Sequence, residues 1–334
     1  MKKISFFDVK SYDKSSFNLI NQHFDFQLDY FEDRLSLKNV QNTKGSEAIC
    51  IFVEDNIDKE MIDALVNCGV KLIALRCAGY NNIDLEYAKG KLQVVRVPSY
   101  SPSSVAEHAM ALILGLNRKT YLSYFRSRIG DFSLEGMLGS DLNGKTIGIV
   151  GTGAIGKKMI DIANGFKMKV LAYDVYPDQK LQKENKCSYV SLEELLKESD
   201  IISLHCPLTE DNHHMIRKET IDKMKNGVMI INTGRGKLIN TKDLIDGLKS
   251  YKISAAGLDV YEEEEAYFYN DYSTSIIKDD VLARLIFFPN VIVTSHQGFF
   301  TKEALKNIAE TTLQNISDYF QKKPLENKVI FQKQ

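Results

Sequence analysis

Short apolar runs alternate with amphipathic stretches along the first part of the chain. Buried strands are predicted by four runs rich in β-branched residues, KISFFDV, EAICIFV, KLIALRC and QVVRVP. Between the second and third runs, DKEMIDALVNCG has the spacing of an amphipathic helix that ends at Gly69. Strands and helices that alternate in this way indicate a parallel sheet covered by helices.

A different kind of helix is predicted next, in SYSPSSVAEHAMALILGLNRKT. Ser101 can cap this helix, and Pro102 suits its first turn. From Val105 to Leu116 the helix is apolar almost all round, so it must be buried on all sides. We expect it at an interface between domains or subunits. Residues 126–145 are irregular and contain glycine, which predicts a connecting loop or arm.

A second series of strands and helices fills the rest of the chain. Its predicted strands are TIGIV, KVLAYD, IISLH, VMIINT, ISAAGLDV and VIVTS. One helix between them, SLEELLKES, opens with the capping box of Ser191 and Glu194. The last long helix, TKEALKNIAETTLQNISDYFQ, carries a single apolar stripe. The predicted fold class is therefore α/β, with two domains built on parallel sheets.

Composition supports two domains and narrows the partners. The chain has 334 residues, and a domain usually has roughly 150, so we expect two domains. A net charge of -1 gives no electrostatic footprint for nucleic acid or anionic membrane. We expect the chain to have neither a membrane-spanning helix nor a signal peptide, since no apolar stretch is long enough for the first and the N-terminal segment lacks the apolar region of the second. Its five cysteines, an odd number without CxxC spacing, indicate reduced thiols in a cytoplasmic protein and no metal site.

The stretch TIGIVGTGAIGKKMIDIANGFKMKVLAYD contains a GxGxxG motif at Gly151, Gly153 and Gly156. A strand precedes the motif, a helix follows, and a second strand ends in Asp174, which is the context that a dinucleotide site needs. Gly151 permits the tight turn, Gly153 lets the backbone approach the pyrophosphate, and Gly156 lets the helix pack close to the strand. The phosphates would lie at the helix N-terminus.

Asp174 predicts the cofactor. Its carboxylate would accept hydrogen bonds from the adenosine ribose and repel a 2′-phosphate, which favours NAD over NADP. Because the motif starts near residue 151, the NAD-binding Rossmann domain is predicted over residues 102–298. Residues 1–101 and 299–334 would then form the substrate domain, with the active site in the cleft between the two.

Oxidation of a hydroxy acid needs a cation for the carboxylate and a proton carrier for the hydroxyl. Arg235 follows a strand in the glycine-flanked turn NTGRG, where α/β sheets place ligands, and its planar fork suits a carboxylate. His296 ends the strand VIVTSHQ and is the best acid/base candidate. His108 is interpreted as a packed histidine and His205 as lining the cofactor groove. Polar surroundings make the remaining histidines, among them His214, poor candidates.

A carboxylate should orient and stabilise the charged form of the histidine. The run YEEEEAYF, after the strand that ends in Asp259, offers four glutamates, Glu262 to Glu265. A run of acids is usually a solvated loop. Spacing alone does not choose among the four.

The ordered motifs decide the choice by resemblance. The GxGxxG strand with Asp174, SLHCPLTEDNHHMI, INTGRG, LDVYEEE and TSHQGFF occur in the order of the D-specific 2-hydroxyacid dehydrogenase family, over essentially the whole chain. LRCAGYNNID, VRVPSYSPSSVAEHA and FSLEG resemble in particular its fermentative D-lactate dehydrogenases. The resemblance implies a flavodoxin-like substrate domain, and it places the catalytic glutamate at Glu264, which leaves the neighbouring glutamates as polar loop positions.

The resemblance also implies the roles of the site residues. Arg235 would bind the substrate carboxylate, and His296 would donate the proton, with Glu264 stabilising its charged form. Cofactor contacts would come from Ala154, Ile155, Cys206, Pro207, Asn212, Thr233, Gly234 and Asp259, the last holding the nicotinamide carboxamide. Substrate contacts would come from Phe52, Ala78, Gly79, Tyr100 and Phe299. The implied reaction is reversible hydride transfer between NADH and pyruvate, giving D-lactate.

The choice of substrate is open within the family. Phe52, Tyr100 and Phe299 should crowd the pocket and favour a methyl group, yet many relatives have tyrosine in place of Phe52. Hydroxyisocaproate, phenyllactate or glycerate dehydrogenase activity is the first alternative. The second is a non-enzymatic, NAD-responsive corepressor-like binder, which the intact Arg235, Glu264 and His296 set disfavours. We expect a homodimer or homotetramer.

Overall fold

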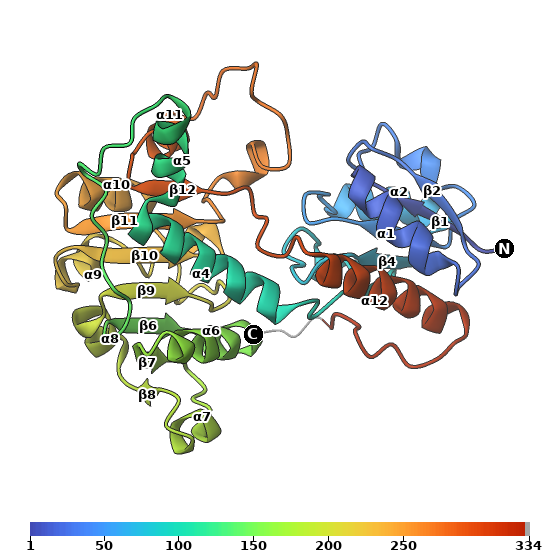
Figure 1. Cartoon of the computed structure of the whole chain (residues 1–334). Helices are drawn as coiled ribbons and strands as arrows, with labels where there is room; N and C mark the ends of the chain where they lie inside the picture. Colours follow the sequence, from blue (N-terminus) through green and yellow to red (C-terminus); the bar gives the residue numbers. More distant parts are fainter. Residues whose placement is uncertain (331–334) are drawn as a thin grey trace. The chain divides into compact units, whose positions relative to one another are not determined.

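The computed structural model describes residues 1–330 and divides into two compact units, each described here by itself. The first unit combines Met1–Ser101 with the C-terminal segment that begins at Phe300. The second unit is Pro102–Phe299. Figure 1 shows that the chain runs from the first unit into the second and returns to the first for its last long helix.

The first unit is a five-stranded sheet in the order β2-β1-β3-β4-β5, with every strand pair parallel. The strands are β1 (Lys3–Phe6), β2 (Gln27–Tyr30), β3 (Ala48–Ile51), β4 (Leu72–Leu75) and β5 (Gln93–Val95). The helices are α1 (Ser11–Asn21), α2 (Lys59–Asn67), α3 (Leu85–Ala88) and α12 (Lys302–Phe320), with the 3-10 turn η1 (Val40–Thr43). This strand order is that of flavodoxin-like folds.

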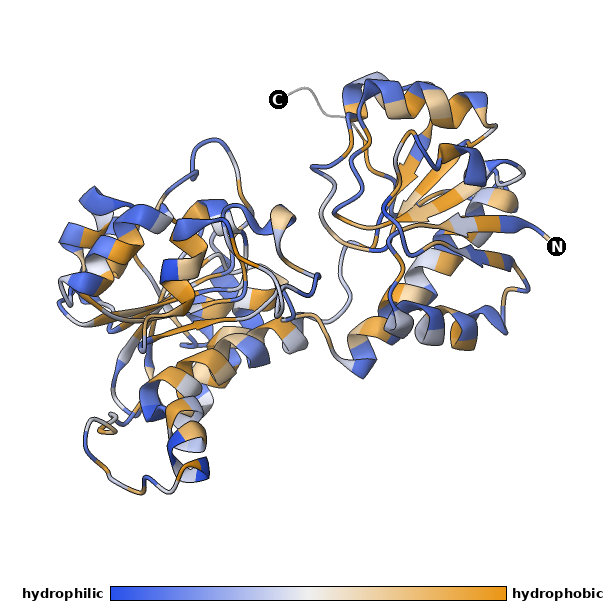
Figure 2. Cartoon of the chain, turned by 90° about the horizontal axis from the view of Figure 1, so that it is seen from above, coloured by the Kyte–Doolittle hydropathy of each residue, from blue (hydrophilic) through white to orange (hydrophobic). Residues whose placement is uncertain are grey.

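Burial explains which strands of this unit could be predicted. All four residues of β3 and of β4 are buried. The helix α12 packs on β4 and on α1, and α2 packs near η1 and α3. Figure 2 shows the strands of this unit mostly in hydrophobic colours. The edge strand β2 was not predicted, although its sequence QLDY alternates polar and apolar residues, because it has only four residues and none of them is buried.

The second unit is a seven-stranded sheet in the order β12-β11-β10-β9-β6-β7-β8, again parallel throughout. Its strands are β6 (Thr146–Val150), β7 (Lys169–Tyr173), β8 (Ser188–Tyr189), β9 (Ile201–Leu204), β10 (Val228–Asn232), β11 (Ile253–Leu258) and β12 (Val291–Val293). β7 and β8 lie on one side of β6, and β9 to β12 follow in order on the other side, which is the strand order of the Rossmann fold. The prediction of an α/β fold with two parallel sheets is confirmed.

Helices cover both faces of this sheet. They are α4 (Pro102–Arg118), α5 (Thr120–Arg128), α6 (Ala154–Gly165), α7 (Gln179–Lys183), α8 (Leu192–Glu198), α9 (Lys218–Lys223), α10 (Thr241–Lys249) and α11 (Asp280–Ile286), with the 3-10 turns η2 (Gly236–Leu238) and η3 (Glu264–Ala266). Ile231 packs in the core under α4 and α6, whereas its neighbour Ile230 packs in the opposite core under α8 to α10. Consecutive apolar residues are therefore buried on both faces.

The local signals of this unit hold in part: among the described residues only the Ser191 half of the capping box is formed, and α4 is exposed at Glu107 and Ala111 rather than buried on all sides. The side chain of Ser191 caps α8 by accepting from the Glu194 amide at 3.2 Å. The helix α4 has most of its apolar residues buried against α6, β10, β11 and β12. The arm predicted over residues 126–145 begins as the last turn of α5 and is irregular from Ile129 onward. Across residues 1–330, no helix is long and apolar enough to cross a membrane.

Candidate active site

The register of the second sheet aligns the predicted site residues. Strand partners form one row across the sheet: Tyr173, Val150, Leu204, Asn232, Leu258 and Val293. The residue after each of these leaves the carboxyl end of its strand: Asp174, Gly151, His205, Thr233, Asp259 and Thr294. In open parallel sheets this edge is where ligands bind. Motifs far apart in the sequence thus meet at one edge of one sheet.

The glycines of the first turn are required by close packing. Gly151 has a positive φ of 92°, and a Cβ there would lie 2.6 Å from the Cys206 nitrogen. A Cβ at Gly156 would overlap the carbonyl of Gly151. A Cβ at Gly153 would meet nothing within 4 Å, so open space lies in front of α6, which begins at Ala154. The first amides of α6 face that space without a side-chain cap, which fits a pyrophosphate.

Asp174 is already held in place at the end of β7. Its Oδ2 accepts from the Thr152 amide at 2.6 Å and from the Thr152 hydroxyl at 3.0 Å. Its Oδ1 accepts from the Tyr176 amide at 2.8 Å. Oδ2 thus accepts two hydrogen bonds, whereas Oδ1 retains a lone pair for a ribose hydroxyl. The Tyr189 hydroxyl donates to Thr152 at 2.8 Å and braces the turn from β8, a contribution that the sequence analysis did not foresee.

The loop after β9 is shaped by Asn212. The side-chain amide of Asn212 closes the loop. Its nitrogen donates to the Pro207 carbonyl at 2.7 Å, and its oxygen accepts from the Thr209 backbone amide at 2.8 Å. Burial raises the pKa of the Cys206 thiol to about 11, which leaves it unreactive at neutral pH. Burial lowers the pKa of His205 to about 4, and its enclosed Nδ1 has no partner within residues 1–330. His205 is therefore neutral, as a wall residue should be.

Asn232 and Gly236 shape the turn that contains Arg235. The buried Asn232 side chain accepts from the Gly234 amide at 3.0 Å and donates to the Arg235 carbonyl at 2.9 Å. A Cβ at Gly236 would overlap the carbonyl of Tyr261, so only glycine lets this turn reach the β11 loop. Arg235 forms no ion pair with any described acid, and its Nη1 donates only to the Gly234 carbonyl, at 2.8 Å. Its charge is thus available to an anion.

The structure brings His296 and Glu264 together. His296 Nδ1 lies 2.9 Å from Glu264 Oε1, and the two side chains are 20% and 17% exposed. Glu264 is fixed in turn, because its Oε2 accepts from the Tyr261 amide at 3.0 Å. An ionised carboxylate only accepts, so Nδ1 of His296 carries the hydrogen of this bond. The opposite ring nitrogen, Nε2, is then the one that can exchange a proton with a ligand.

His296 is placed by a strained turn. Its φ is +52°, in the left-handed region that costs energy for a residue other than glycine. The His296 amide donates to the Asp259 carbonyl at 2.7 Å, which anchors the turn to β11. The Tyr269 hydroxyl donates to the His296 carbonyl at 3.4 Å. The imidazole therefore has a single orientation rather than a flexible one.

Asp259, only 1% exposed, has the most heavily used carboxylate of the site. Its Oδ1 accepts from the Thr294 hydroxyl at 2.5 Å and the Gln297 amide at 2.9 Å, and His108 Nε2 lies 3.3 Å away. Its Oδ2 accepts from the Gly298 amide at 2.8 Å. Burial alone would raise the pKa of Asp259, but the hydrogen bonds from His108 and Thr294 outweigh it, and the pKa lies below its usual value.

The run of four glutamates has two inward and two outward members. Glu263 and Glu265 are exposed, as predicted. Glu262 was predicted to be a polar loop position, but it is half-buried, with Oε1 2.6 Å from His214 Nε2 and Oε2 accepting from the Thr241 amide at 2.7 Å. His214, which was also set aside, is thus half of a second histidine–glutamate pair. No local signal distinguishes Glu262, since its partners are distant in sequence.

The first unit places Phe52 beside a buried charge. Phe52 follows β3, and its amide donates to Asp55 Oδ2 at 2.8 Å. Asn82 donates to the Phe52 carbonyl at 3.1 Å. The guanidinium carbon of Arg76 lies 4.8 Å from the centre of the Phe52 ring, and Arg76 is 2% exposed. The Phe52 backbone is therefore held by Asp55 and Asn82, and its ring lies against Arg76, three residues that the sequence analysis did not name.

Other predicted substrate contacts lie at the same edge of the first sheet or at the end of the second unit. Ala78 and Gly79 follow β4, and within residues 1–330 neither amide donates a hydrogen bond. The Tyr100 carbonyl accepts from the Asn307 side chain at 2.6 Å. Phe299 is 9% exposed and is the last residue of the second unit.

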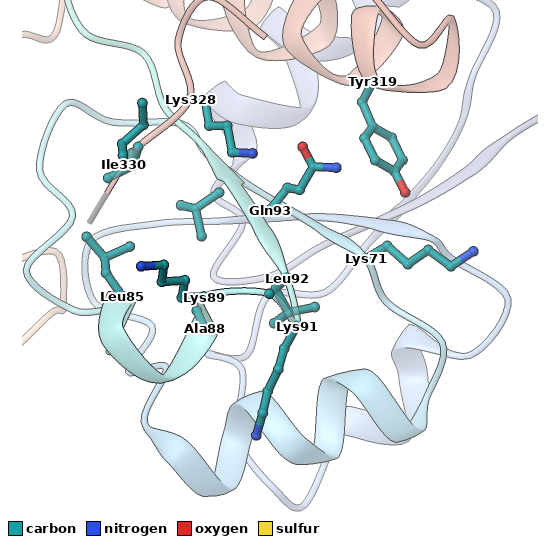
Figure 3. Close-up of a pocket in the computed structure, with 13 residues that line it drawn as sticks. Lys71, Leu85, Ala88, Lys89, Lys91, Leu92, Gln93, Tyr319, Lys328 and Ile330 are labelled. Carbon is teal, nitrogen blue, oxygen red and sulfur yellow. The ribbon is translucent and has the colours of Figure 1, made fainter. Parts of the chain in front are cut away.

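A separate hollow of about 590 Å³ lies along β5 in the first unit (Figure 3). Lysines surround its apolar wall: Lys71, Lys89, Lys91 and Lys328. Lys91 turns toward α2, where it pairs with Asp63 at 2.7 Å. The predicted site residues do not line this hollow.

Comparisons with known proteins agree with this geometry. Residues 110–298 match the family model of the D-isomer specific 2-hydroxyacid dehydrogenase, NAD binding domain. The chain is 47% identical to the D-lactate dehydrogenase of Escherichia coli over 95% of this chain and 96% of that protein. The apo-structure of the E. coli enzyme has a TM-score of 0.90 at 44% identity, covering 98% of this chain and 100% of that one. The pyruvate reductase of Chlamydomonas reinhardtii has a TM-score of 0.93 at 43% identity, covering 98% of both chains.

The family match shows an NAD-dependent oxidoreductase, as predicted, and the Rossmann sheet with its glycine turn agrees with it. The chain belongs to the D-isomer-specific 2-hydroxyacid dehydrogenase family.

Proposed function

We propose that this protein reduces pyruvate to D-lactate with NADH, in a reversible reaction. The observation that carries the proposal is the His296–Glu264 pair, which lies at the same sheet edge as the dinucleotide turn and Arg235. The relatives named above act on pyruvate or D-lactate by their names and match the chain over nearly its full length.

Each group has a task in the proposed reaction. Bound NADH supplies the hydride that reaches the keto carbon. Protonated His296 gives the Nε2 proton to the keto oxygen and becomes neutral, while Glu264 stabilises the charged ring before the transfer and holds it in place. Arg235 holds the substrate carboxylate with its planar fork. In the reverse direction His296 Nε2 takes the hydroxyl proton, so the same residues serve both directions.

The cofactor is proposed to lie along the sheet edge. Its pyrophosphate would meet the amides of Ala154 and Ile155 beyond Gly153, where the space is open. Its adenosine ribose would bind Asp174, under the loop of Cys206 and Pro207 that Asn212 closes. Thr233 and Gly234 would line the nicotinamide ribose, and the buried Thr233 hydroxyl has no partner within residues 1–330 that would compete. Asp259 Oδ2, with one described donor, can accept from the carboxamide.

The first unit is proposed to be the substrate domain and the second the NAD-binding domain. The amides of Ala78 and Gly79 would share the substrate carboxylate with Arg235. Phe52, Tyr100 and Phe299 would surround the methyl group of pyruvate. An extra methylene in an apolar pocket changes binding by only about 1–3 kcal/mol, so longer 2-keto acids should be turned over more slowly rather than refused.

Turnover with four keto acids tests the proposal. The loss of NADH absorbance is followed with pyruvate, phenylpyruvate, 2-ketoisocaproate and hydroxypyruvate, and the handedness of the product is determined. Fast conversion of pyruvate to D-lactate is expected. A preference for a bulkier acid would keep the mechanism and replace the substrate. An absence of turnover with all four, in protein that binds NADH, would favour the corepressor-like alternative.

We further propose that the protein is a homodimer or a dimer of dimers. Large apolar side chains are exposed on α5 and the arm that follows it: Tyr124, Phe125, Ile129, Phe132, Leu134 and Leu138. Exposed apolar residues so close together indicate a protein interface. Sedimentation of a monomer at micromolar concentration would refute this proposal. We also propose a cytoplasmic location, which the five free thiols support.

A further inference from the structure

His108 makes polar contacts that packing alone does not require. It lies on α4, and its side chain is 18% exposed. Its Nε2 lies 3.0 Å from the Thr294 hydroxyl and 3.3 Å from Asp259 Oδ1. These two residues leave the carboxyl ends of β12 and β11, beside the turn that carries His296. A helix that packs across the sheet therefore places a ring nitrogen behind the proposed active site.

The direction of these hydrogen bonds can be worked out. The Thr294 hydroxyl has one hydrogen and lies 2.5 Å from Asp259 Oδ1. Asp259 is ionised at neutral pH, because its pKa lies below the usual value, so its oxygen can only accept. Thr294 must then donate to Asp259 and can only accept from His108. Hence Nε2 of His108 carries a hydrogen and is the donor at the end of the chain His108 → Thr294 → Asp259.

Asp259 transmits this arrangement to the catalytic turn. The same carboxylate accepts from the amides of Gln297 and Gly298, and the Asp259 carbonyl accepts from the His296 amide. If the Asp259 carboxylate rotated, it could not keep the hydrogen bonds from both the Gln297 amide and the Gly298 amide. Gly298 lets the turn lie close to the carboxylate and to His108, since a Cβ there would lie 3.0 Å from Asp259 Oδ2 and 3.5 Å from His108 Cδ2.

We propose that His108 is a positioning residue, which fixes the Asp259 carboxylate through Thr294 and thereby holds the left-handed turn that presents His296. The inference rests on the proposed role of His296 as proton carrier. His108 itself touches neither substrate nor the transferred proton in this scheme. Its contribution is to the rate of the chemical step rather than to the affinity for the keto acid.

Two substitutions separate positioning from packing. His108→Leu keeps an apolar side chain but removes the donor, whereas His108→Gln can place an amide donor near the position of Nε2. For His108→Leu, kcat with pyruvate should fall about threefold to tenfold, in line with the loss of one hydrogen bond to a neutral hydroxyl, while the KM for pyruvate stays within about twofold. His108→Gln should recover most of the lost kcat. Full kcat in His108→Leu, or an equal loss in both variants, would overturn the proposal.

NMR spectra of the histidine rings provide a readout that needs no turnover. They report which ring nitrogen carries the hydrogen, and six histidines are simple to assign by substitution. We expect the Nε2–H form for His108, and a shifted His296 signal in His108→Leu but not in the control His23→Leu, which alters an exposed histidine. An Nδ1–H form, or an unmoved His296 signal, would refute the positioning role even if the proposed reaction fails. Thr294→Val, which breaks the same chain, serves if His108→Leu does not fold.

Discussion

Replacing Glu264 by glutamine tests the pair that defines the proposed site. The carboxylate lies 2.9 Å from His296 Nδ1 and 3.0 Å from the Tyr261 amide, and it accepts from both. Glutamine has one carbonyl oxygen and one amide group, so only one of these two donors can keep its acceptor. Either His296 loses its orienting partner or the loop that carries residue 264 is loosened.

The size of the effect follows from the chemistry of this bond. A hydrogen bond to a charged group contributes about 1.5–3 kcal/mol. Because about 1.4 kcal/mol corresponds to a factor of ten in rate, kcat for pyruvate reduction should fall about 10-fold to 100-fold. The KM for NADH should change little, since Glu264 is not assigned to the cofactor.

The same run of glutamates supplies matched controls. Glu263 and Glu265 are exposed, so Glu263→Gln and Glu265→Gln should keep the activity of the parent within about twofold, as surface substitutions usually do. Initial rates at saturating NADH and pyruvate compare the three variants directly. A Glu264→Gln variant with full activity, or a control variant with an equal loss, would refute the assignment of Glu264.

Three further predictions concern the carboxylate, the cofactor and acid stability. Arg235→Gln should raise the KM for pyruvate about 100-fold, since loss of one member of a charged pair costs about 2–5 kcal/mol, and NADH fluorescence titration should show unchanged cofactor binding; unchanged KM would refute its role. Asp174→Asn keeps an acceptor for the Thr152 amide but removes the charge, so the ratio of NADPH to NADH turnover should rise, and a constant ratio would show that the charge does not select NAD. The pKa of His205 is lowered to about 4, so below about pH 6.5 the folded state binds fewer protons than the unfolded state. The free energy of unfolding therefore decreases as the pH falls. Between pH 7 and pH 5 this loss is about 2 kcal/mol, and in urea unfolding it should be absent from His205→Asn.

Local sequence signals predicted the parts of the molecule that local interactions build. The close packing of Gly156 on Gly151 and the cap at Ser191 each depend on residues within a few positions, so their patterns are readable. The buried strands β6 and β10 are largely apolar because both faces are covered. By contrast, β2 is half-exposed and its alternation QLDY is only four residues long, and β8 has only two residues, Ser188–Tyr189, so neither gives a strong pattern.

The contacts that shape the site are long-range, and the sequence could not predict them. His108 meets Thr294, 186 positions away, because α4 packs across β11 and β12. Glu262 meets His214, 48 positions away. The choice of Glu264 among four glutamates needed the family resemblance, whereas the structure separates Glu262 and Glu264 from the outward-facing pair by burial.

The central claim is that His296 carries the proton in an NAD-dependent reduction, and His296→Gln tests it most directly. General acid catalysis contributes about 100-fold to 10,000-fold, so the variant should lose at least 100-fold in kcat with pyruvate. It should bind NADH as tightly as the parent, measured by the fluorescence of NADH in a protein that has no tryptophan. A variant that keeps its turnover would contradict the account, and so would one that loses NADH binding together with activity.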